Sequence, residues 1–509
     1  MTWSDENLAY KMFDTYMYDI DSGEGDCGSM LICNEGNFEN RLICGMHVAG
    51  GNKHGFSTGI CRENIDKLVL DTFGFTPTLE DEVVTIGETC DQIMSQGSLA
   101  PIIVLKKEFT PSEVFKSEIR KSRLHKLLPE PYNKVTTMPA KLRPWLNEDG
   151  DFIDPTDIAF KKYGKVSPDI DVKLVDAAFE SFENLILRHD TTSEEAKRVY
   201  TVKEALHAID NINTISSSTS SGFPMSLPGQ EDLKKMYYKA LEEGDHELAE
   251  SVYQRIALLV EETIAKYHEG IRTLSVYKQC GKDETISAVK VLMGKIRLFA
   301  ACPFIFLVMF RMYFGAYMSM FIGLNLKIGS AVGVNPYSED WDAIARRLLQ
   351  FSDNAKEKSV GAGDQGEFDT RQWAIIQARN GDSINRWYGK DKTMDNFIRD
   401  CLFLEITNSR HLYRGLIYEW FSGLPSGNPM TAILNTMYNH IVFRISWQIA
   451  GLAIVEFNDS VYLIVLGDDN QFSVHKKYRE IFNEVTLPDY MAKVGMKYTT
   501  ELKGEAAQP

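Results

Sequence analysis

The chain contains 509 residues, which is enough for more than one domain and a large hydrophobic core. Its 71 acidic and 55 basic residues leave a net charge of −16. This excludes a uniformly basic nucleic-acid binder but not a local basic channel, because the local field steers a charged substrate. Eight cysteines without a C-x-x-C pair or zinc spacing, and no visible signal peptide, favour a reducing cytosol over secretion.

The N-terminal region carries two glycine-flanked motifs, Gly25-Asp-Cys27-Gly and Gly45-Met-His47-Val. In a tight turn of the first kind, backbone N–H groups can form an oxyanion hole beside the thiol. The alternative is a buried structural cysteine in a β-barrel. A polar stretch of small residues, 91–101, follows and has the composition of a linker that contains the pair Gln96-Gly97.

Three segments in the middle of the chain differ in composition. Ser217-Ser-Thr-Ser-Ser-Gly-Phe-Pro224 is a loop of small residues that can approach a nucleic-acid backbone closely. The basic segment from Lys282 to Arg297 can clamp a triphosphate. The stretch 298–326 is apolar enough for a membrane span, although Pro303 and Arg311 interrupt it. We favour the alternative, a helix of the core.

Two acidic islands lie in the C-terminal third of the chain. The first is Asp364-Gln-Gly-Glu-Phe-Asp369, and the second is Gly467-Asp468-Asp469. Apolar runs at 461–466 and 471–474 flank the second island, which predicts a β-hairpin with two carboxylates at its tip. A Gly-Asp-Asp turn by itself is ordinary turn chemistry. Aspartates that converge from two strands, however, can hold two Mg²⁺ ions, as in-line nucleotidyl transfer requires.

Between the islands, Ser422-Gly-Leu-Pro-Ser426-Gly427-Asn-Pro leads into an apolar stretch that runs to Ala450. This pattern predicts a glycine-rich loop that feeds a helix. Thr431 and Asn435 are four residues apart, so they project from one face of that helix. A buried polar side chain at such a place lets a site select substrates that carry a ribose 2′-hydroxyl.

The order and spacing of these motifs resemble the RNA-dependent RNA polymerases of picorna-like viruses, nearest to the dicistrovirus and marine picorna-like groups. The resemblance covers about residues 97–509. It implies an α+β fold of the right-hand polymerase type, with fingers and a βαββ antiparallel palm. We expect the palm strands near 358–364 and 461–474, and its helices near 370–388 and 427–449.

The resemblance also implies roles for individual residues. Asp364 and Asp468 match the aspartates that coordinate the catalytic Mg²⁺ (or Mn²⁺) ions, and Asp469 matches a supporting metal ligand. Asp369 and Asn435 match the pair that hydrogen-bonds the 2′-hydroxyl of the incoming nucleotide. The other expected nucleotide-binding residues are Lys282, Lys290, Lys295 and Arg297 in the entry channel, and Ser426, Gly427 and Thr431, which couple base pairing to closure.

Other positions complete the comparison with the polymerases. Lys503 matches the lysine proposed to protonate the leaving pyrophosphate. Leu466 stands where the family usually carries tyrosine, and Ile286 where many relatives place an arginine; neither departure removes a metal ligand. The expected RNA contacts are Thr219, Ser220 and Gly222.

A second resemblance, over residues 1–96, is to the C-terminal barrel of a viral 3C-type chymotrypsin-like cysteine protease. Cys27 matches the nucleophile, and His47 matches the histidine that recognises glutamine in the specificity pocket. In this protease order the catalytic histidine and acid precede the nucleophile, but no histidine lies before Cys27. We therefore expect a truncated, vestigial protease. Gln96-Gly97 is expected to be a cleavage junction, with an incidental turn as the alternative.

Together, these features predict a protease fragment at 1–96 and a polymerase at 97–509 whose thumb is largely missing, both within a longer polyprotein. The expected function is template-directed RNA synthesis for replication of a positive-strand RNA virus genome; the alternative is a non-catalytic RNA-binding precursor. The expected partners are an RNA template–primer, nucleoside triphosphates, viral replication proteins and a protein primer, with no intrinsic membrane span. The expected location is the host cytoplasm, at membrane-associated replication complexes.

Overall fold

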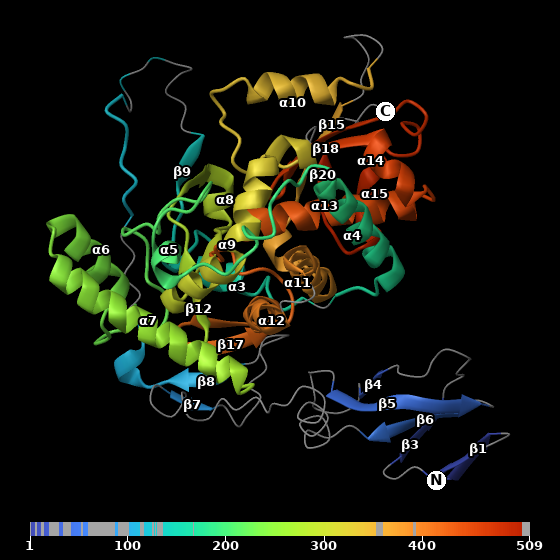
Figure 1. Cartoon of the computed structure of the whole chain (residues 1–509), viewed down its shortest axis with the longest axis horizontal. Helices are drawn as coiled ribbons and strands as arrows, with labels where there is room; N and C mark the ends of the chain where they lie inside the picture. Colours follow the sequence, from blue (N-terminus) through green and yellow to red (C-terminus); the bar gives the residue numbers. More distant parts are fainter. Residues whose placement is uncertain are drawn as a thin grey trace.

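The computed structural model describes residues 101–500 except 112–116, 125–126, 128, 130–135, 166, 353–359 and 390–392 (Figure 1). Before residue 101 it describes Glu88 and the course of seven strands. Cys27, Gln96-Gly97 and Lys503 lie outside the described residues, and of His47 only its place in a strand is described. The seven strands are β1 (Thr2–Asp5), β2 (Leu8–Lys11), β3 (Thr15–Asp19), β4 (Met30–Cys33), β5 (Leu42–Gly51), β6 (His54–Gly59) and β7 (Gly87–Thr89).

The first six strands form two antiparallel sheets. One is the pair β1-β2, and the other has the order β3-β6-β5-β4. Several short antiparallel strands of this kind are compatible with a barrel, but they do not by themselves establish a protease. The predicted protease fragment therefore stays a prediction.

A six-stranded sheet has the order β14-β12-β16-β17-β8-β7. β12 and β16 are parallel, and the other neighbouring pairs are antiparallel. Because β7 precedes and β8 follows the predicted boundary at residue 96, that boundary falls between two paired strands. The remaining strands of this sheet are β8 (Pro101–Leu105), β12 (Val276–Gly281), β14 (Leu298–Ala301), β16 (Ser409–Tyr413) and β17 (Leu416–Trp420).

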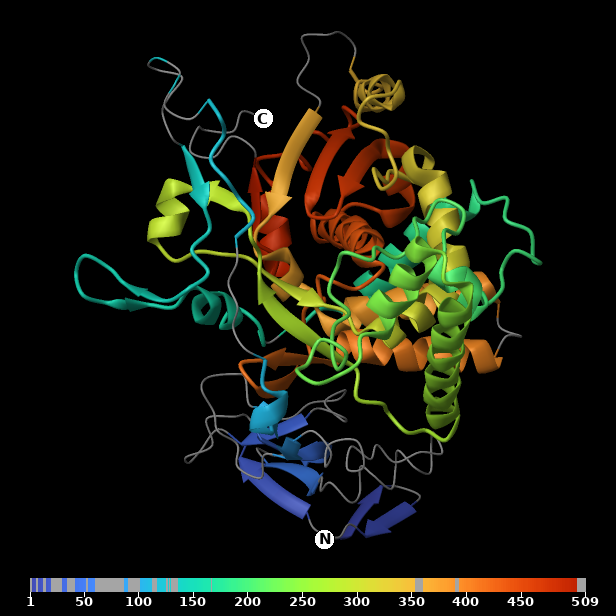
Figure 2. The ribbon, with the colours of Figure 1, turned by 90° about the vertical axis from the view of Figure 1, so that its left-hand side faces the viewer.

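A four-stranded antiparallel sheet, which we call the palm sheet, has the order β18-β19-β15-β20. Helix α13 (Thr431–Ile449) lies beneath it (Figure 2), and α4 (Val172–Leu187) and α11 (Ala374–Tyr388) pack against that helix. Packing on several sides explains why α13 is buried around most of its circumference. The strands are β15 (Val360–Gln365), β18 (Val461–Leu466), β19 (Asp469–Val474) and β20 (Tyr498–Thr500).

The palm sheet confirms the predicted strands and helices, with two shifts. The helix expected from 427 begins at Thr431, because the residues before it stay in the loop. The helix expected from 370 begins at Ala374, after the short 3-10 helix η3 (Phe368–Arg371). Strand β20 was not predicted, since three residues are too few to show an alternating pattern.

The other helices surround the two larger sheets. Asp232 and Asp245 cap the first turns of α6 and α7 by accepting backbone N–H groups, and Gly244 ends α6 with a φ of +74°. Two small antiparallel pairs join β9 (Thr137–Pro139) to β13 (Thr285–Ser287), and β10 (Trp145–Leu146) to β11 (Phe152–Ile153). The remaining helices are α3 (Pro155–Phe160), α5 (Val202–Leu206), α6 (Leu233–Glu243), α7 (His246–His268), α8 (Ala288–Leu292), α9 (Phe304–Leu324), α10 (Asp340–Leu348), α12 (Thr393–Thr407), α14 (Phe457–Ser460), α15 (Leu487–Lys493), η1 (Lys107–Phe109), η2 (Asn325–Ile328) and η4 (Ile454–Glu456).

Helix α9 is the apolar stretch for which two interpretations were open. By length and composition, Phe304–Ile328 is long and apolar enough to cross a membrane, but 78% of its most apolar window is buried inside the protein. The one charged side chain of α9 (Phe304–Leu324), Arg311, donates to the carbonyl oxygens of Ala205 (2.6 Å), His207 (2.6 Å) and Asn213 (3.0 Å). The burial and these contacts support the core-helix prediction.

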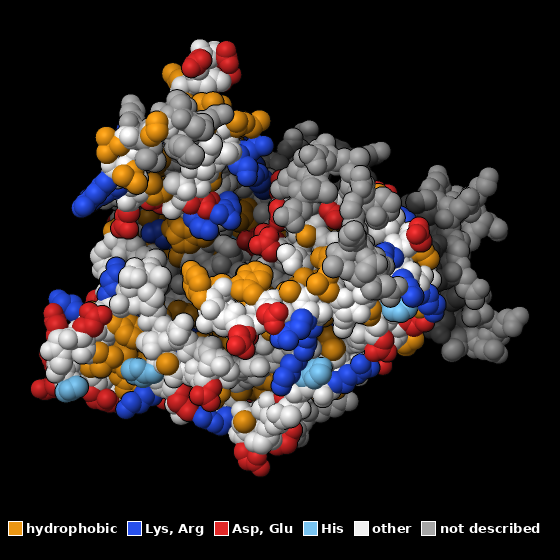
Figure 3. Space-filling model, turned by 90° about the horizontal axis from the view of Figure 1, so that it is seen from above, with side chains coloured by type: hydrophobic (Ala, Val, Ile, Leu, Met, Phe, Trp, Pro, Cys, Tyr) orange, Lys and Arg blue, Asp and Glu red, His pale blue; other side chains and the backbone are white. Residues whose placement is uncertain are grey.

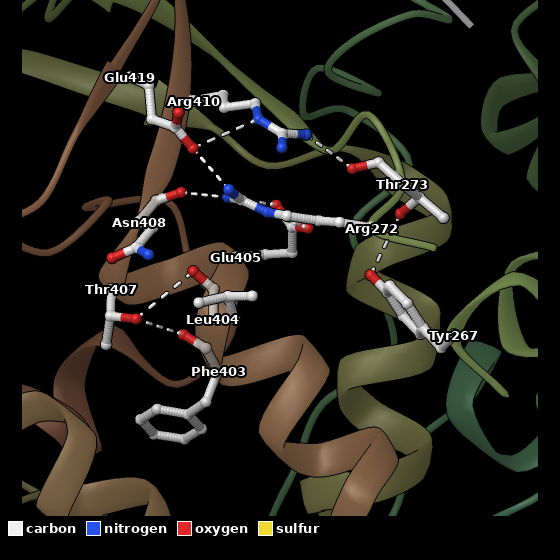
Figure 4. Close-up of polar contacts among 10 residues, drawn as sticks. All are labelled: Tyr267, Arg272, Thr273, Phe403, Leu404, Glu405, Thr407, Asn408, Arg410 and Glu419. Carbon is white, nitrogen blue, oxygen red and sulfur yellow. Dashed lines mark hydrogen bonds and ion pairs between the residues drawn. The ribbon is translucent and has the colours of Figure 1, made fainter. Parts of the chain in front are cut away.

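A buried ion cluster joins α12, the β16–β17 hairpin and the segment after α7 (Figure 4). Arg272 donates to Glu405 at 2.9 Å and to Glu419 at 2.5 Å, and Glu405 is fully buried. Arg410 lies 3.5 Å from Glu419 and donates to the carbonyl oxygen of Thr273 at 2.8 Å. Burial lowers the pKa of Arg272, but the two carboxylates outweigh that effect and raise it overall. Two arginines thus neutralise two glutamates inside the fold.

Candidate active site

Two aspartates face each other across neighbouring strands of the palm sheet. Asp364, in β15, is paired in register with Asp469, the first residue of β19. Asp468 precedes it in the two-residue loop Gly467-Asp468, which closes the predicted β18–β19 hairpin. Gly467 has a φ of +67°, as the first loop position of a type II′ turn requires. Burial, followed by the charges of Asp468 and Asp364, raises the pKa of Asp469, so the three carboxylates converge.

Neutral side chains hold this loop from below. Asn439 Nδ2, on α13, donates to the carbonyl oxygens of Gly467 (3.1 Å) and Asp468 (3.2 Å). Thr436 Oγ1 accepts from the N–H of Gly467 at 3.2 Å, and Gln365 Nε2 donates to Asn439 Oδ1 at 3.3 Å. We did not predict these positioning residues. The available signal was a set of polar side chains at helix positions that face the core.

The predicted ribose pair is brought together by a chain of buried amides. Asn435 Nδ2 donates to Asp369 Oδ1 at 3.2 Å, and Asn435 Oδ1 accepts from Gln372 Nε2 at 2.6 Å. Gln377 donates to Gln372 Oε1, and Asn380 donates to Gln377 Oε1 at 3.1 Å. Because Gln372 occupies the acceptor oxygen of Asn435, the amide nitrogen of Asn435 must face Asp369. The three residues of α11 and its approach therefore set the orientation of Asn435.

Asp369 as a whole residue is partly exposed, but its carboxyl group is buried. Burial raises the pKa of Asp369 to about 6, against the lowering effect of the hydrogen bond from Asn435. The charge of Asp468 raises this pKa further, whereas Arg297 and Lys282 lower it. Asp369 is thus within electrostatic reach of both the acidic hairpin and the basic segment.

The glycine-rich loop before α13 packs against β14. Ser426 Oγ accepts from the N–H of Ala300 at 3.2 Å. A Cβ atom on Gly427 would lie 1.7 Å from the Ala300 carbonyl oxygen, so only glycine fits there. Thr431 Oγ1 donates to the carbonyl oxygens of Asn428 (2.7 Å) and Ser426 (3.1 Å), which ties the helix start to the loop. A movement of this loop would therefore shift Thr431 and, one helical turn later, the position of Asn435.

The predicted basic segment faces the acidic hairpin. Arg297 Nε donates to Glu284 Oε1 at 2.7 Å, and Lys282 lies 3.7 Å from the same carboxylate. The hydrogen bond to Glu284 raises the pKa of Arg297, and the charges of Asp468 and Asp369 raise it further. Arg297 and Lys282 therefore act on the acidic site, whereas Lys290 and Lys295 are exposed elsewhere on the segment.

A cavity of about 660 Å³ opens beside the paired aspartates. Palm-sheet residues line one side and the α10 region lines another. Figure 3 shows the molecule hollowed near its centre, where acidic side chains lie close to lysine and arginine side chains of an overhanging lobe. The cavity is lined by, among others, Pro336, Trp341, Asp364, Leu466, Asp469 and Gln471.

In the described part of the chain, no three His, Cys, Asp or Glu side chains form a ready-made metal cage. Mg²⁺ is usually held by one or two carboxylates together with substrate phosphates and water, so such a cage is not required. Asp364 and Asp469 are paired across the strands, and Asp468 is exposed beside them. This donor set fits divalent cations.

Comparison with known proteins identifies the family. Residues 128–507 match the family model described as viral RNA-dependent RNA polymerase, a range that includes both acidic islands and the glycine-rich loop. The chain belongs to this family. Its palm sheet, acidic hairpin and α13 are therefore parts of a polymerase fold.

Named relatives agree with the family. The chain is 28% identical over 541 residues to the replicase polyprotein of Cricket paralysis virus, a match that covers 98% of the chain and 29% of the relative. The chain is 27% identical over 529 residues to the replicase polyprotein of Drosophila C virus, a match that covers 97% of the chain and 29% of the relative. Among solved structures, the Sicinivirus 3Dpol RNA dependent RNA polymerase matches at a TM-score of 0.58 and 20% identity, over 78% of this chain and 76% of that one, which shows the fold. The chain spans less than a third of those two polyproteins.

The loop expected to contact RNA contains both exposed and buried residues. Thr219 and Ser220 are exposed, and the buried Lys234 donates to the carbonyl oxygen of Thr219 at 2.8 Å. Gly222 is buried, and a Cβ atom there would lie 2.1 Å from the carbonyl oxygen of Cys302. The glycine at 222 therefore serves packing within the protein, while Thr219 and Ser220 present a surface.

A group of lysines acts on Lys162, which follows α3; of these we predicted only Lys295 as a site residue. Burial lowers the pKa of Lys162, and the charges of Lys295, Lys165 and Lys497 lower it further, against the raising effect of Glu367. Lys165 forms an ion pair with Glu367. Lys295 thus belongs with these lysines rather than with Arg297. The four lysines come from three distant segments, and single lysines carry no motif.

Proposed function

We propose that this chain supplies the fingers and palm of an enzyme that carries out template-directed RNA synthesis by two-metal nucleotidyl transfer. The observation that carries the proposal is the register pairing of Asp364 with Asp469, with Asp468 in the adjoining turn. Family membership supports the same assignment.

The three aspartates would hold Mg²⁺ or Mn²⁺. When bound, these ions would lower the pKa of the primer 3′-hydroxyl and neutralise charge on the transferred phosphoryl group. Asn439 and Thr436 keep the turn carrying Asp468 in place through its backbone. Positioning of this kind reduces the reorganisation needed as charge develops.

The basic segment would bind the incoming nucleoside triphosphate. Arg297 and Lys282 lie within electrostatic reach of Asp369, so a triphosphate between them and the palm meets cations on one side and metal ligands on the other. The same cations would stabilise the departing diphosphate. Lys290 and Lys295 would extend the entry path, and Lys503 remains our predicted proton donor to the pyrophosphate.

Asn435 would read the ribose. Its amide nitrogen faces Asp369, so a 2′-hydroxyl near this pair can accept from Asn435 while donating to Asp369. A deoxyribonucleotide would leave these buried polar groups without a partner, which disfavours its binding. The cavity beside Asp364 and Asp469 offers space for the end of a primer strand.

The decisive experiment is Asp468→Asn in the polymerase, measured by primer extension on an RNA template with Mg²⁺. Loss of a metal ligand should slow incorporation by roughly a thousandfold, equivalent to several kcal/mol of transition-state stabilisation. Asp342→Asn, at an exposed aspartate of α10, is the matched control and should keep the wild-type rate. A wild-type rate in Asp468→Asn would contradict the assignment. If neither the wild type nor Asp342→Asn extends a primer but both bind RNA, the RNA-binding alternative is favoured.

A further inference from the structure

A second polar cavity, of about 230 Å³, lies at the end of β18 remote from the acidic turn. Residues after α4, in η2, on α10 and on α13 line it together with the first residues of β18. At about 3.3 Å per residue along a strand, Val461–Leu463 lie roughly 17–23 Å from Asp468. We call this cavity the basic pocket; its chemistry is carried by Arg188, Lys327, Arg347, His440, Arg444 and Tyr462.

The charge of the basic pocket is unusual for an acidic protein. Arg188, Lys327, Arg347 and Arg444 line it, whereas no aspartate or glutamate is among its described lining residues. Arg188 approaches the carboxylate of Asp459 at 3.7 Å, but both side chains are mostly exposed, so this pair neutralises little. The chain as a whole carries more acidic than basic residues, so composition does not explain four cations around one cavity.

Arg444 is the innermost of these cations, with only 1% of its surface exposed. Its described hydrogen-bond acceptors are neutral: Asn458 Oδ1 at 2.7 Å, the His440 carbonyl oxygen at 3.1 Å, His440 Nδ1 at 3.2 Å and Ser181 Oγ at 3.4 Å. Burial without an opposite charge lowers the pKa of Arg444 to about 9. A buried cation is normally paired with an opposite charge, which none of these four acceptors supplies.

Two neighbouring groups also lack an anionic partner. The hydroxyl of Tyr462, a residue with 9% of its surface exposed, has no hydrogen-bond acceptor among the described residues. Arg347 donates to the carbonyl oxygen of Leu326, and its guanidinium lies 5.8 Å from the centre of the Tyr462 ring. Lys327, at the mouth, is exposed. These donors surround one space and match an acceptor with several oxygens and more than one negative charge.

We propose that the basic pocket binds a small anion rich in phosphate oxygens, such as pyrophosphate or the phosphorylated headgroup of a lipid. Arginine guanidinium groups suit phosphate because their parallel N–H groups can donate to two oxygens. The volume is below the range typical of pockets for whole drug-sized ligands, so a compact polyphosphate fits better than an entire nucleotide. The site does not depend on the proposed polymerase chemistry.

The test is calorimetric titration of the protein with inorganic pyrophosphate in the presence of EDTA. Lys327→Glu should weaken binding at least about tenfold, because it reverses a charge at the mouth without removing a described internal hydrogen bond. The matched control is Arg346→Glu, since Arg346 neighbours Arg347 on α10 but does not line the pocket and pairs with Asp342 at 2.7 Å. It should bind within about twofold of wild type.

Two further variants separate this site from the active site and from general charge effects. Asp468→Asn should bind pyrophosphate like the wild type even if it abolishes primer extension. Tyr462→Phe should weaken binding by about tenfold while leaving the charge unchanged. No binding by the wild type, or equal binding by Lys327→Glu and Arg346→Glu, would overturn the proposal whatever the outcome of the polymerase assay.

A second arm identifies the source of the phosphate. Sedimentation with phosphatidylcholine vesicles that contain phosphatidylinositol 4-phosphate measures headgroup binding directly. Vesicle binding that Lys327→Glu abolishes and pyrophosphate displaces supports a headgroup in the same pocket, whereas pyrophosphate binding without vesicle binding supports a free anion. Vesicle binding that Lys327→Glu leaves intact, without pyrophosphate binding, counts against the pocket.

Discussion

Charged side chains are arranged in opposite ways in two regions of the molecule. These are the buried ion cluster around Arg272 and the acidic hairpin of the palm sheet. In the ion cluster, Glu405 and Glu419 both contact Arg272, so each carboxylate meets a cation inside the fold. In the hairpin, Asp364 faces Asp469, so like charges meet. The first arrangement pairs opposite charges within the protein, whereas the second brings like charges together. Burial and these like charges raise the pKa of Asp469, and the arrangement favours an added cation.

The scaffolds around the two sites differ accordingly. The hairpin turn is held by Asn439, Thr436 and Gln365, and none of these side chains carries a charge that could neutralise the aspartates. Arg297, whose pKa the charge of Asp468 raises, is already paired with Glu284. The side chains that hold the turn therefore position Asp468 without adding an opposite charge beside it, which suits a metal-dependent site.

The largest expected effect is on protein stability and tests the ion cluster around Arg272. Glu405→Gln would remove a fully buried charge and leave Arg272 partly uncompensated, so the free energy of unfolding should fall by about 3 kcal/mol. Chemical denaturation measures this change. Glu243→Gln breaks a pair in which both side chains are exposed and should cost less than about 1 kcal/mol. Similar losses in the two variants would show that the cluster is not a structural element.

A second effect concerns ribose selection next to the hairpin. Asn435→Ala should lower the preference for ribonucleotides over deoxyribonucleotides by roughly 1–3 kcal/mol, because the 2′-hydroxyl would lose a buried partner. Gln372→Met keeps the approximate shape but frees the amide of Asn435 to rotate, so it should lower the preference by a smaller amount. Single-nucleotide incorporation gives kcat/KM for each substrate.

The same experiment distinguishes Asn435, which is expected to contact the ribose, from Gln372, which orients Asn435. Ribonucleotide incorporation itself should persist in both variants, unlike in Asp468→Asn. An unchanged preference in Asn435→Ala would show that another residue reads the 2′-hydroxyl. A loss in Asn435→Ala with no change in Gln372→Met would show that the amide chain does not orient it.

The smallest effect tests the repulsion among the aspartates. The pKa of Asp469 is raised in the folded protein, so the folded state holds its proton more tightly than the unfolded state. Stability from this group is therefore greatest below its ordinary pKa and declines as pH rises through the raised value. Asp469→Asn should flatten that decline in metal-free protein by less than about 1 kcal/mol, since the side chain is exposed.

Thermal unfolding at several pH values in EDTA measures the slope. Asp342→Asn, at an exposed aspartate outside the site, serves as the control. A steeper decline in Asp469→Asn than in the wild type would contradict convergence of the carboxylates. Addition of Mg²⁺ should stabilise the wild type more than Asp469→Asn, because a ligand that binds the folded state raises its stability.

Local sequence patterns were sufficient for the main palm elements. Apolar runs on both sides of Gly467-Asp468 predicted the hairpin, and the break at Ser426-Gly427 predicted the loop before α13. These features depend on residues within a few positions of one another, where turn chemistry and periodicity act directly. The starts of α11 and α13 lie four residues after the predicted ones, since their first turns depend on contacts with distant segments.

By itself, then, the sequence determined the class of the protein, the acidic islands and the pairing of Asp369 with Asn435. Only the tertiary structure decided which polar side chains support them. Arg272 and Glu405 are 133 positions apart, and Gln372 and Asn435 are 63 apart. Each of these side chains is typical of an exposed surface when considered alone, and it becomes buried and paired only when packing removes water and brings its partner within hydrogen-bond distance.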